Sequence, residues 1–301
     1  MNPAPLVTAY VPAYNHAEYV EHTLQSLAKQ TYSRIEMIVI NDGSTDDTGG
    51  VVARFRDLHK DRFERFEFIE QENQGVSATT NTALKLAQGE FIFHIASDDG
   101  LCEPRALEHL VDIMLADNSV GVACGDACFI DATGETTTIR HRGRDYESFI
   151  WLKSRHRFDS DKPGEFGSYR SLLAGNYIPV GLLIRMAAYD KIGRFRAGKY
   201  LEDYDLWLRI AKHYRISLYR GVLSEYRIHA NNASGKLGEH IARETGELLL
   251  REKDYAIAEG HVRQWSSGAL LAGLRIIRHC PPEDWLMAAR MLLLSIAARL
   301  R

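Results

Sequence analysis

The sequence has 301 residues, of which 45% are hydrophobic and 26% are charged, and its net charge is −3. This is the composition of a soluble globular chain long enough for one α/β domain with an extension, or for two domains. The slightly acidic balance argues against a general nucleic-acid binder, and no stretch reaches the roughly 18 apolar residues of a membrane span. Because the first charge is Glu18, we expect no secretory signal and predict a cytoplasmic enzyme.

Strand and helix patterns alternate along the first 118 residues. Short apolar runs predict strands at residues 6–13, 35–40, 66–69 and 90–96, and helical periodicity follows each of them. Alternation with short connections is typical of a mostly parallel sheet covered by helices on both faces. Ligands of such sheets bind at the carboxyl ends of the strands. We therefore expect three polar turns to line one crevice: Tyr14-Asn15, Asp42-Gly43-Ser44 and Asp98-Asp99.

The second half of the chain is less regular. The pattern predicts a hairpin from residues 120–130 to 136–139, strands at 176–184, 216–219 and 223–228, and a helix at 202–213. Residues 140–170 are polar and mixed in charge, so we predict a mobile loop or an insertion that binds the acceptor. From about residue 239 the pattern is helical to the end. Cys124 and Cys128 are predicted to share one strand face as a buried thiol pair rather than a metal site.

Asp98 and Asp99 stand side by side where the fourth predicted strand ends. Mg²⁺ and Mn²⁺ take oxygen ligands, usually one or two carboxylates together with substrate phosphates. Such an ion stabilises the charge that develops on a leaving diphosphate. The alternative is a helix N-cap, because Pro104 marks the first turn of the next predicted helix. A cap needs only one aspartate, so we favour the metal site.

Glu202 and Asp203 form a second acidic pair at the start of a predicted helix. Acidic residues are electrostatically favoured at a helix start, which is the alternative explanation for the pair. Transfer of a group to a hydroxyl needs a base that takes the acceptor proton, and a carboxylate within hydrogen-bond reach is suitable.

Five motifs stand in the order found in family 2 glycosyltransferases: Val11-Pro12-Ala13-Tyr14-Asn15, Asn41-Asp42-Gly43-Ser44-Thr45-Asp46, Asn73-Gln74-Gly75, Ser97-Asp98-Asp99 and Leu201-Glu202-Asp203. The chain resembles this family over roughly residues 6–230. The resemblance implies the GT-A fold, a Rossmann-like, mostly parallel sheet flanked by helices. We expect a catalytic domain at residues 1–235, divided into a nucleotide-binding half (1–118) and an acceptor-binding half (119–235). A C-terminal helical region would follow at residues 236–301.

The resemblance also implies roles for single residues. Asp99 would bind Mn²⁺ or Mg²⁺ directly, and Asp98 would contact the ribose or act as a second ligand. Asp203 would be the base, with Glu202 beside the acceptor or donor sugar. His229 is either a further metal ligand or a surface residue. The expected nucleotide-sugar contacts are Pro12, Ala13, Tyr14, Asn15, Asp42, Gly75, Asn81 and Asp98. Ser97 stands near the start of the family's acidic DxD motif, which leaves one carboxylate fewer.

These observations predict a metal-dependent, inverting hexosyl- or hexosaminyltransferase that moves a sugar from a UDP-sugar to a glycan or lipid-linked acceptor in cell-surface polysaccharide synthesis. The alternatives are a non-catalytic nucleotide-sugar-binding scaffold and a sugar nucleotidyltransferase; the second usually opens with a glycine-rich, basic loop that is missing here.

Residues 261–301 carry six arginines against Glu283 and Asp284. We expect this segment to pack on the catalytic domain, to form a homodimer contact, or to lie on the inner face of a membrane.

Overall fold

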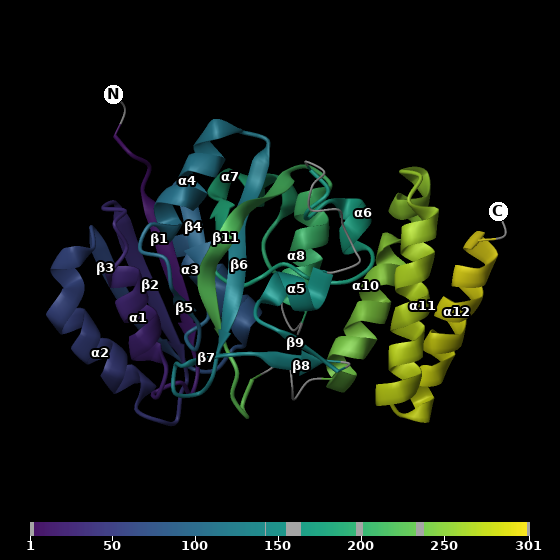
Figure 1. Cartoon of the computed structure of the whole chain (residues 1–301), viewed down its shortest axis with the longest axis horizontal. Helices are drawn as coiled ribbons and strands as arrows, with labels where there is room; N and C mark the ends of the chain where they lie inside the picture. Colours follow the sequence, from purple (N-terminus) through teal and green to yellow (C-terminus); the bar gives the residue numbers. More distant parts are fainter. Residues whose placement is uncertain (1–2, 142, 155–163, 197–200, 233–237, 300–301) are drawn as a thin grey trace. The chain divides into compact units, whose positions relative to one another are not determined.

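The computed structural model describes residues 3–141, 143–154, 164–196, 201–232 and 238–299 (Figure 1). The chain divides into two compact units. The first comprises Met1–Arg155, Tyr177–Gly198 and His213–Ile228, and the second comprises His156–Asn176, Lys199–Lys212 and His229–Arg301. The expected catalytic and C-terminal domains, with their boundary at residue 235, are functional divisions and stay a prediction.

A nine-stranded sheet forms the centre of the first unit, with the order β3-β2-β1-β4-β10-β6-β11-β5 and β7 paired to β6. Strands β1, β2, β3 and β4 are parallel to one another, whereas β10 is antiparallel to both β4 and β6. The strands are β1 (Val7–Ala13), β2 (Ile35–Asp42), β3 (Arg65–Gln71), β4 (Phe91–His94), β5 (Gly100–Leu101), β6 (Val120–Ile130), β7 (Thr136–Thr137), β10 (Leu182–Arg185) and β11 (Arg215–Arg227). This mostly parallel α/β architecture confirms the predicted fold class.

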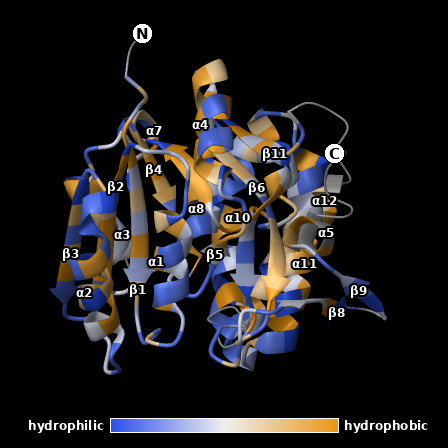
Figure 2. Cartoon of the chain, turned by 60° about the vertical axis from the view of Figure 1, so that its left-hand side comes forward, coloured by the Kyte–Doolittle hydropathy of each residue, from blue (hydrophilic) through white to orange (hydrophobic). Residues whose placement is uncertain are grey.

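The central strands are apolar because both faces of the sheet are covered. All eight residues of β2 are buried, and β4 is one of the hydrophobic strands in Figure 2. Even Glu36 of β2 is fully buried, and the Arg65 guanidinium neutralises it at 2.9 Å. The helices of this unit are α1 (Val20–Ala28), α2 (Thr48–His59), α3 (Val76–Leu86), α4 (Ala106–Ala116), α5 (Phe149–Ser154) and α7 (Met186–Ile192), with a 3₁₀ turn at Lys60–Arg62.

Several predicted elements differ from those observed. The strand expected at residues 176–184 is only the four-residue β10, and the two strands expected between 216 and 228 are one strand, β11, with irregular register. Residues 140–170 contain a small hairpin, β8 (Ile139–His141) with β9 (Arg144–Tyr146), and the helices α5 and α6 (Tyr169–Leu172). The described residues are therefore not an irregular loop, the insertion that binds the acceptor stays a prediction, and residues 155–163 lie outside the described part.

The predicted thiol pair was also wrong. Residues four apart on a strand share a face but lie roughly 13 Å apart, which is too far for contact. The Cys124 thiol donates to the Ser217 carbonyl (3.8 Å), while Cys128 and Cys102 both donate to the Ser224 carbonyl (3.6 and 3.7 Å). Cys128 thus lies beside Cys102, the residue after β5, and this hydrogen-bonded neighbour together with burial raises the pKa of the Cys102 thiol.

Helices build the second unit: α6, α8 (Glu202–Ala211), α10 (Gly238–Ala258), α11 (Val262–His279) and α12 (Trp285–Arg299), with a 3₁₀ turn at Pro282–Asp284. Helices α10, α11 and α12 run side by side (Figure 1). The buried Trp265 indole donates to the Leu249 carbonyl (2.6 Å), which joins α11 to α10. Gly268 allows α11 to approach the Leu173 carbonyl, because an added Cβ would lie 2.0 Å from that oxygen. Among the described residues, no helix is long and apolar enough to cross a membrane.

Candidate functional site

The turns after β1, β2 and β4 meet at the carboxyl edge of the sheet in the first unit. The Asn15 backbone N–H donates to the Ser44 hydroxyl (2.9 Å), and the Asn15 side-chain oxygen accepts from the Thr45 N–H (2.8 Å). A hydrogen bond of 2.8 Å joins His16 Nδ1 to the Ser97 hydroxyl. Asn15 has a φ of +53°, a left-handed conformation that asparagine tolerates better than most residues. The three polar turns thus lie together, as expected.

The two aspartates at this edge face different partners. Asp98 Oδ2 lies 3.9 Å from His16 Nε2. Asp99 is turned toward β11 and α1: its Oδ1 accepts from the Arg227 backbone N–H (3.0 Å), and its carbonyl accepts from the Thr23 hydroxyl (2.6 Å). Neither aspartate caps the following helix, because α4 begins only at Ala106 and has no side-chain cap. The N-cap alternative for the pair is therefore excluded.

Burial and the neighbouring Asp98 charge raise the pKa of the Asp99 carboxyl well above its usual range, although the Arg227 N–H and guanidinium oppose this shift. The Arg227 side chain is itself buried and donates to the Asp98 carbonyl (2.8 Å) and the Asp131 carbonyl (3.0 Å). It also lies over the Tyr19 ring at 5.1 Å. Arg227 therefore fixes the backbone of the aspartate turn.

The donor atoms of this turn fit a divalent cation. Asp98 presents a carboxylate next to the His16 imidazole, and oxygen with imidazole is a ligand set suited to Mn²⁺. A cation here would also stabilise two adjacent carboxylates, because burial and then the Asp98 charge raise the pKa of Asp99.

The residues expected to contact the nucleotide surround the same turns. Pro12 and Ala13 end β1, and Tyr14 beyond them exposes 47% of its surface. The Asp42 carboxylate is buried and accepts from the Gln74 N–H (2.9 Å) and the Gly75 N–H (2.9 Å). Asp42 thereby holds the turn that leads into α3.

Gly75 precedes the first residue of α3 and has a φ of +81°, with no atom within 4 Å of the position that a Cβ would occupy. The backbone there is open to a ligand, and a helix N-terminus favours anions. Asn81 is committed elsewhere: its amide donates to the Phe195 carbonyl (2.8 Å) and accepts from the Phe195 N–H (3.0 Å). Its expected contact with the donor stays a prediction.

The second acidic pair lies in the second unit, at the first turn of α8. Asp203 Oδ2 accepts from the Asn176 amide (2.7 Å), and Oδ1 accepts from the Tyr204 N–H (2.6 Å). Burial raises the pKa of Asp203, and the Asn176 hydrogen bond opposes that shift. Burial and the Asp203 charge raise the pKa of Glu202 well above its usual range, and Glu202 Oε2 has no hydrogen-bond partner among the described residues.

Packing holds this turn in place. The Tyr204 hydroxyl donates to the Leu172 carbonyl (2.6 Å), and an ion pair at 2.9 Å joins Arg209 to the buried Asp205. His229 is also in the second unit, where Nδ1 accepts from the Asn231 N–H (3.2 Å) and the His229 N–H donates to Asn232 Oδ1 (2.6 Å). Its role as a metal ligand stays a prediction.

Sequence reasoning missed two polar side chains of these sites, His16 and Asn176. His16 follows Tyr14-Asn15 at the end of β1, so its place at a strand end was a usable signal. Asn176 had no comparable signal, because it contacts Asp203 only through the fold.

Comparison with known proteins identifies the family. Residues 8–175 match the family model described as glycosyl transferase family 2. An uncharacterized glycosyltransferase of Rickettsia typhi is 30% identical over 274 residues, which cover 88% of this chain and 78% of the relative. The chain belongs to glycosyltransferase family 2. This confirms the family that the five sequence motifs predicted.

Solved structures support the fold of this family 2 glycosyltransferase. S. aureus TarS residues 1–349, solved in complex with UDP-GlcNAc, has a TM-score of 0.62 and 17% identity, covering 97% of this chain and 81% of TarS. The mannosyltransferase PcManGT from Pyrobaculum calidifontis, in complex with GDP-Man and Mn²⁺, has a TM-score of 0.60 and 18% identity, covering 100% of this chain and 82% of its own. At these identities the comparison shows the GT-A type fold.

Proposed function

We propose that the chain transfers a hexosyl or hexosaminyl group from a UDP-sugar to a hydroxyl of a glycan or lipid-linked acceptor in cell-surface polysaccharide synthesis. The observation that carries the proposal is the junction of the three polar turns around the buried Asp98–Asp99 pair. A uracil offers an imide hydrogen to a carboxylate, and Asp42 ends β2, which pairs with β1, the strand that leads into the exposed Tyr14. TarS was solved with a UDP-sugar and PcManGT with a GDP-sugar, so the nucleobase of the donor is tested below.

On the donor side we assign the role of principal metal ligand to Asp98. Its carboxylate faces His16, whereas the Asp99 carboxylate accepts the Arg227 backbone N–H. His229 stands two residues after Arg227, so the Cα atoms of the two residues are at most about 7 Å apart. We propose His229 as a further ligand. Bound Mn²⁺ or Mg²⁺ would neutralise the diphosphate charge that develops as the sugar leaves. Gly75 would allow the donor to approach the start of α3.

On the acceptor side we propose Asp203 as the base. A buried carboxylate with a raised pKa takes a proton more readily than a free aspartate, and Asn176 and Tyr204 fix its orientation. Glu202 would lie beside the acceptor or donor sugar. A single base without a separate nucleophile fits direct displacement, and therefore inversion at the anomeric carbon.

We expect Asn176→Leu to shift the acid limb of the pH–rate profile toward higher pH. The Asn176 hydrogen bond lowers the pKa of Asp203, so its loss raises that pKa further, and the base is then ionised only at higher pH. The profile of kcat/KM for hydrolysis of the donor sugar nucleotide measures the shift. Activity should recover on the plateau above the new pKa; a loss that is equal at every pH would contradict this role.

Calorimetric titration with UDP and with GDP, each with and without Mn²⁺, tests the proposed donor. We expect tight binding of UDP only with the ion, and at least tenfold weaker binding of GDP. Slow hydrolysis of a UDP-sugar would then exclude the non-catalytic scaffold. Release of pyrophosphate from UTP and a sugar phosphate would instead identify the sugar nucleotidyltransferase. A preference for GDP would overturn the assignment of uracil as the nucleobase of the donor.

We also propose that α11 and α12 contact the inner face of a membrane. Exposed apolar side chains on these helices accompany the exposed arginines Arg275, Arg278 and Arg290, a combination that suits an anionic lipid surface. The apolar residues are Leu271, Leu274, Ile277, Leu286, Leu293 and Ile296. The wild type should sediment with phosphatidylglycerol vesicles but not with phosphatidylcholine vesicles, and Leu286→Glu with Leu293→Glu should abolish this. A stable dimer in light scattering that the same changes dissociate would favour self-association instead.

A further inference from the structure

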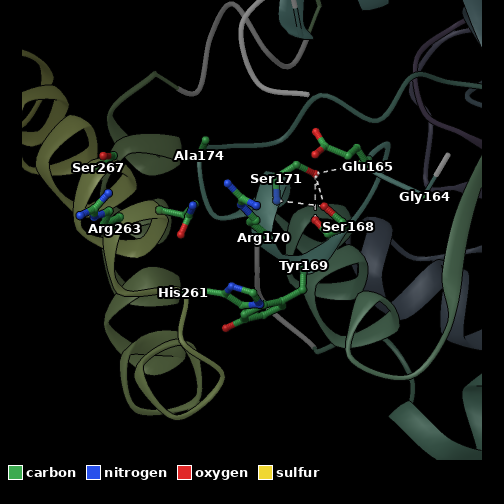
Figure 3. Close-up of a pocket in the computed structure, with 11 residues that line it drawn as sticks. Gly164, Glu165, Ser168, Tyr169, Arg170, Ser171, Ala174, His261, Arg263 and Ser267 are labelled. Carbon is green, nitrogen blue, oxygen red and sulfur yellow. Dashed lines mark hydrogen bonds between the residues drawn. The ribbon is translucent and has the colours of Figure 1, made fainter. Parts of the chain in front are cut away.

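We propose that a cavity in the second unit binds an anionic group, a phosphate or a carboxylate, carried by the acceptor. The cavity has a volume of about 550 Å³, within the usual range of small-molecule sites. Its lining comes from two segments, residues 164–174 and the start of α11 (Figure 3). The inference rests on the proposed function, and it adds the chemical class of the acceptor.

The charges that line the cavity favour an anion. Arg170 and Arg263 contribute two positive charges and Glu165 one negative charge, which leaves the lining at +1 before His261 is counted. With the Gln264 amide turned so that its oxygen faces Arg170, that oxygen accepts from Arg170 Nε (2.9 Å) and Nη2 (3.2 Å), and this neutral partner leaves the guanidinium charge in place. The Arg263 side chain has no hydrogen bond or ion pair within the described part of the chain. Guanidinium groups suit phosphate and carboxylate because they donate two parallel hydrogen bonds.

A rigid frame completes the cavity. The Ser168 hydroxyl donates to the Ser171 hydroxyl (3.0 Å), which donates to the Ser168 carbonyl (2.9 Å), so the two side chains fix one wall; Arg170 lies between them and Arg263 in Figure 3. The His261 imidazole packs against the Tyr169 ring with centroids 5.9 Å apart. The Tyr169 hydroxyl is anchored by the Glu252 carboxylate at 2.7 Å, so this wall is fixed from behind.

The cavity is connected to the proposed base by a short piece of chain. Ala174 lines the cavity, and Asn176, two residues later, donates to Asp203. The Cα atoms of Ala174 and Asn176 are therefore at most about 7.6 Å apart. An acceptor that reaches Asp203 with its hydroxyl is close enough to extend a neighbouring charged group toward Arg170 and Arg263.

Saturation-transfer NMR with three methyl-bearing probes tests the proposal: methyl phosphate, methyl β-glucuronide and the neutral methyl β-glucoside. Saturating UDP and Mg²⁺ block the donor site. We expect at least one anion to bind, and its Kd to rise at least tenfold in Arg263→Gln and in Arg170→Gln. Arg54→Gln, an exposed change on α2, should leave Kd unchanged. Binding of the phosphate alone indicates a phosphorylated or lipid-phosphate acceptor, and binding of the glucuronide alone indicates an acidic sugar.

Two results would overturn the assignment: no binding of either anion to the wild type, or anion affinity that is equal in all four proteins. UDP titration of the same variants keeps this test separate from the proposed donor. If UDP fails to bind the wild type while an anion still binds through Arg170 and Arg263, the donor proposal fails and the anion site stands.

Discussion

Asp98→Asn is expected to remove the ion-dependent part of UDP binding and to lower turnover by at least about a thousandfold, which corresponds to roughly 4 kcal/mol of lost stabilisation. Asp98 is the carboxylate that faces His16, so its loss takes away the oxygen best placed for a divalent cation. Calorimetric titration of UDP with and without Mn²⁺, followed by a transfer or hydrolysis assay, measures both effects.

Asp99→Asn is the matched control, because asparagine keeps an oxygen that accepts the Arg227 N–H. Its effect on ion affinity should stay within the roughly 10- to 100-fold typical of a residue that acts through another ligand. If Asp99→Asn is instead as damaging as Asp98→Asn, Asp99 is the direct ligand, as the family resemblance implies.

Asp99→Asn is also expected to change how the stability of the protein depends on pH. The folded state raises the pKa of Asp99, so it binds the proton more tightly than the unfolded state does. The contribution of Asp99 to stability is therefore present at low pH and falls as pH rises from the ordinary aspartate pKa through the raised one. Without metal, Asp99→Asn should be more stable than the wild type near pH 7, and this advantage should shrink toward pH 4 in urea unfolding.

Asp203→Asn is expected to keep UDP affinity within about twofold and to reduce turnover by about 10²- to 10⁴-fold, the usual contribution of a general base. The isosteric amide still has an oxygen for the Tyr204 N–H, so the first turn of α8 should persist. Titration of UDP and single-turnover transfer with the same preparation separate binding from chemistry. A loss of UDP affinity with unchanged turnover of the bound donor would remove Asp203 from the role of base.

Glu202→Gln provides the comparison within the same acidic pair. It removes the neighbouring charge but keeps the Asp203 carboxylate and its bond from Asn176. Turnover should therefore fall far less than in Asp203→Asn. Equal or greater loss in Glu202→Gln would indicate that Glu202, whose pKa is raised by burial and by Asp203, takes the proton.

The sequence was informative wherever the signal is local. Apolar runs followed by Gly, Asp or Asn predicted β1, β2 and β4 and the polar turns at their ends, because a strand buried on both faces is apolar along most of its length. Helix α8 was predicted from the spacing of Leu206, Trp207 and Ile210, all of which are buried. Helices α1 and α2 start at Val20 and Thr48 without a side-chain cap at the N-cap residue, so no local capping signal marks where they begin.

The sequence by itself therefore determined the fold class, the family and the positions of both acidic pairs, since periodicity and strand ends are written within a few neighbouring residues. Only the tertiary structure decided which carboxylate of the first pair faces His16, because Asp99 is turned away by a bond to Arg227, 128 residues further along the chain. It likewise decided that Asn176 orients Asp203, and that Arg170 and Arg263 line one cavity. These contacts join residues far apart in the chain, and they form only when the helices and strands pack.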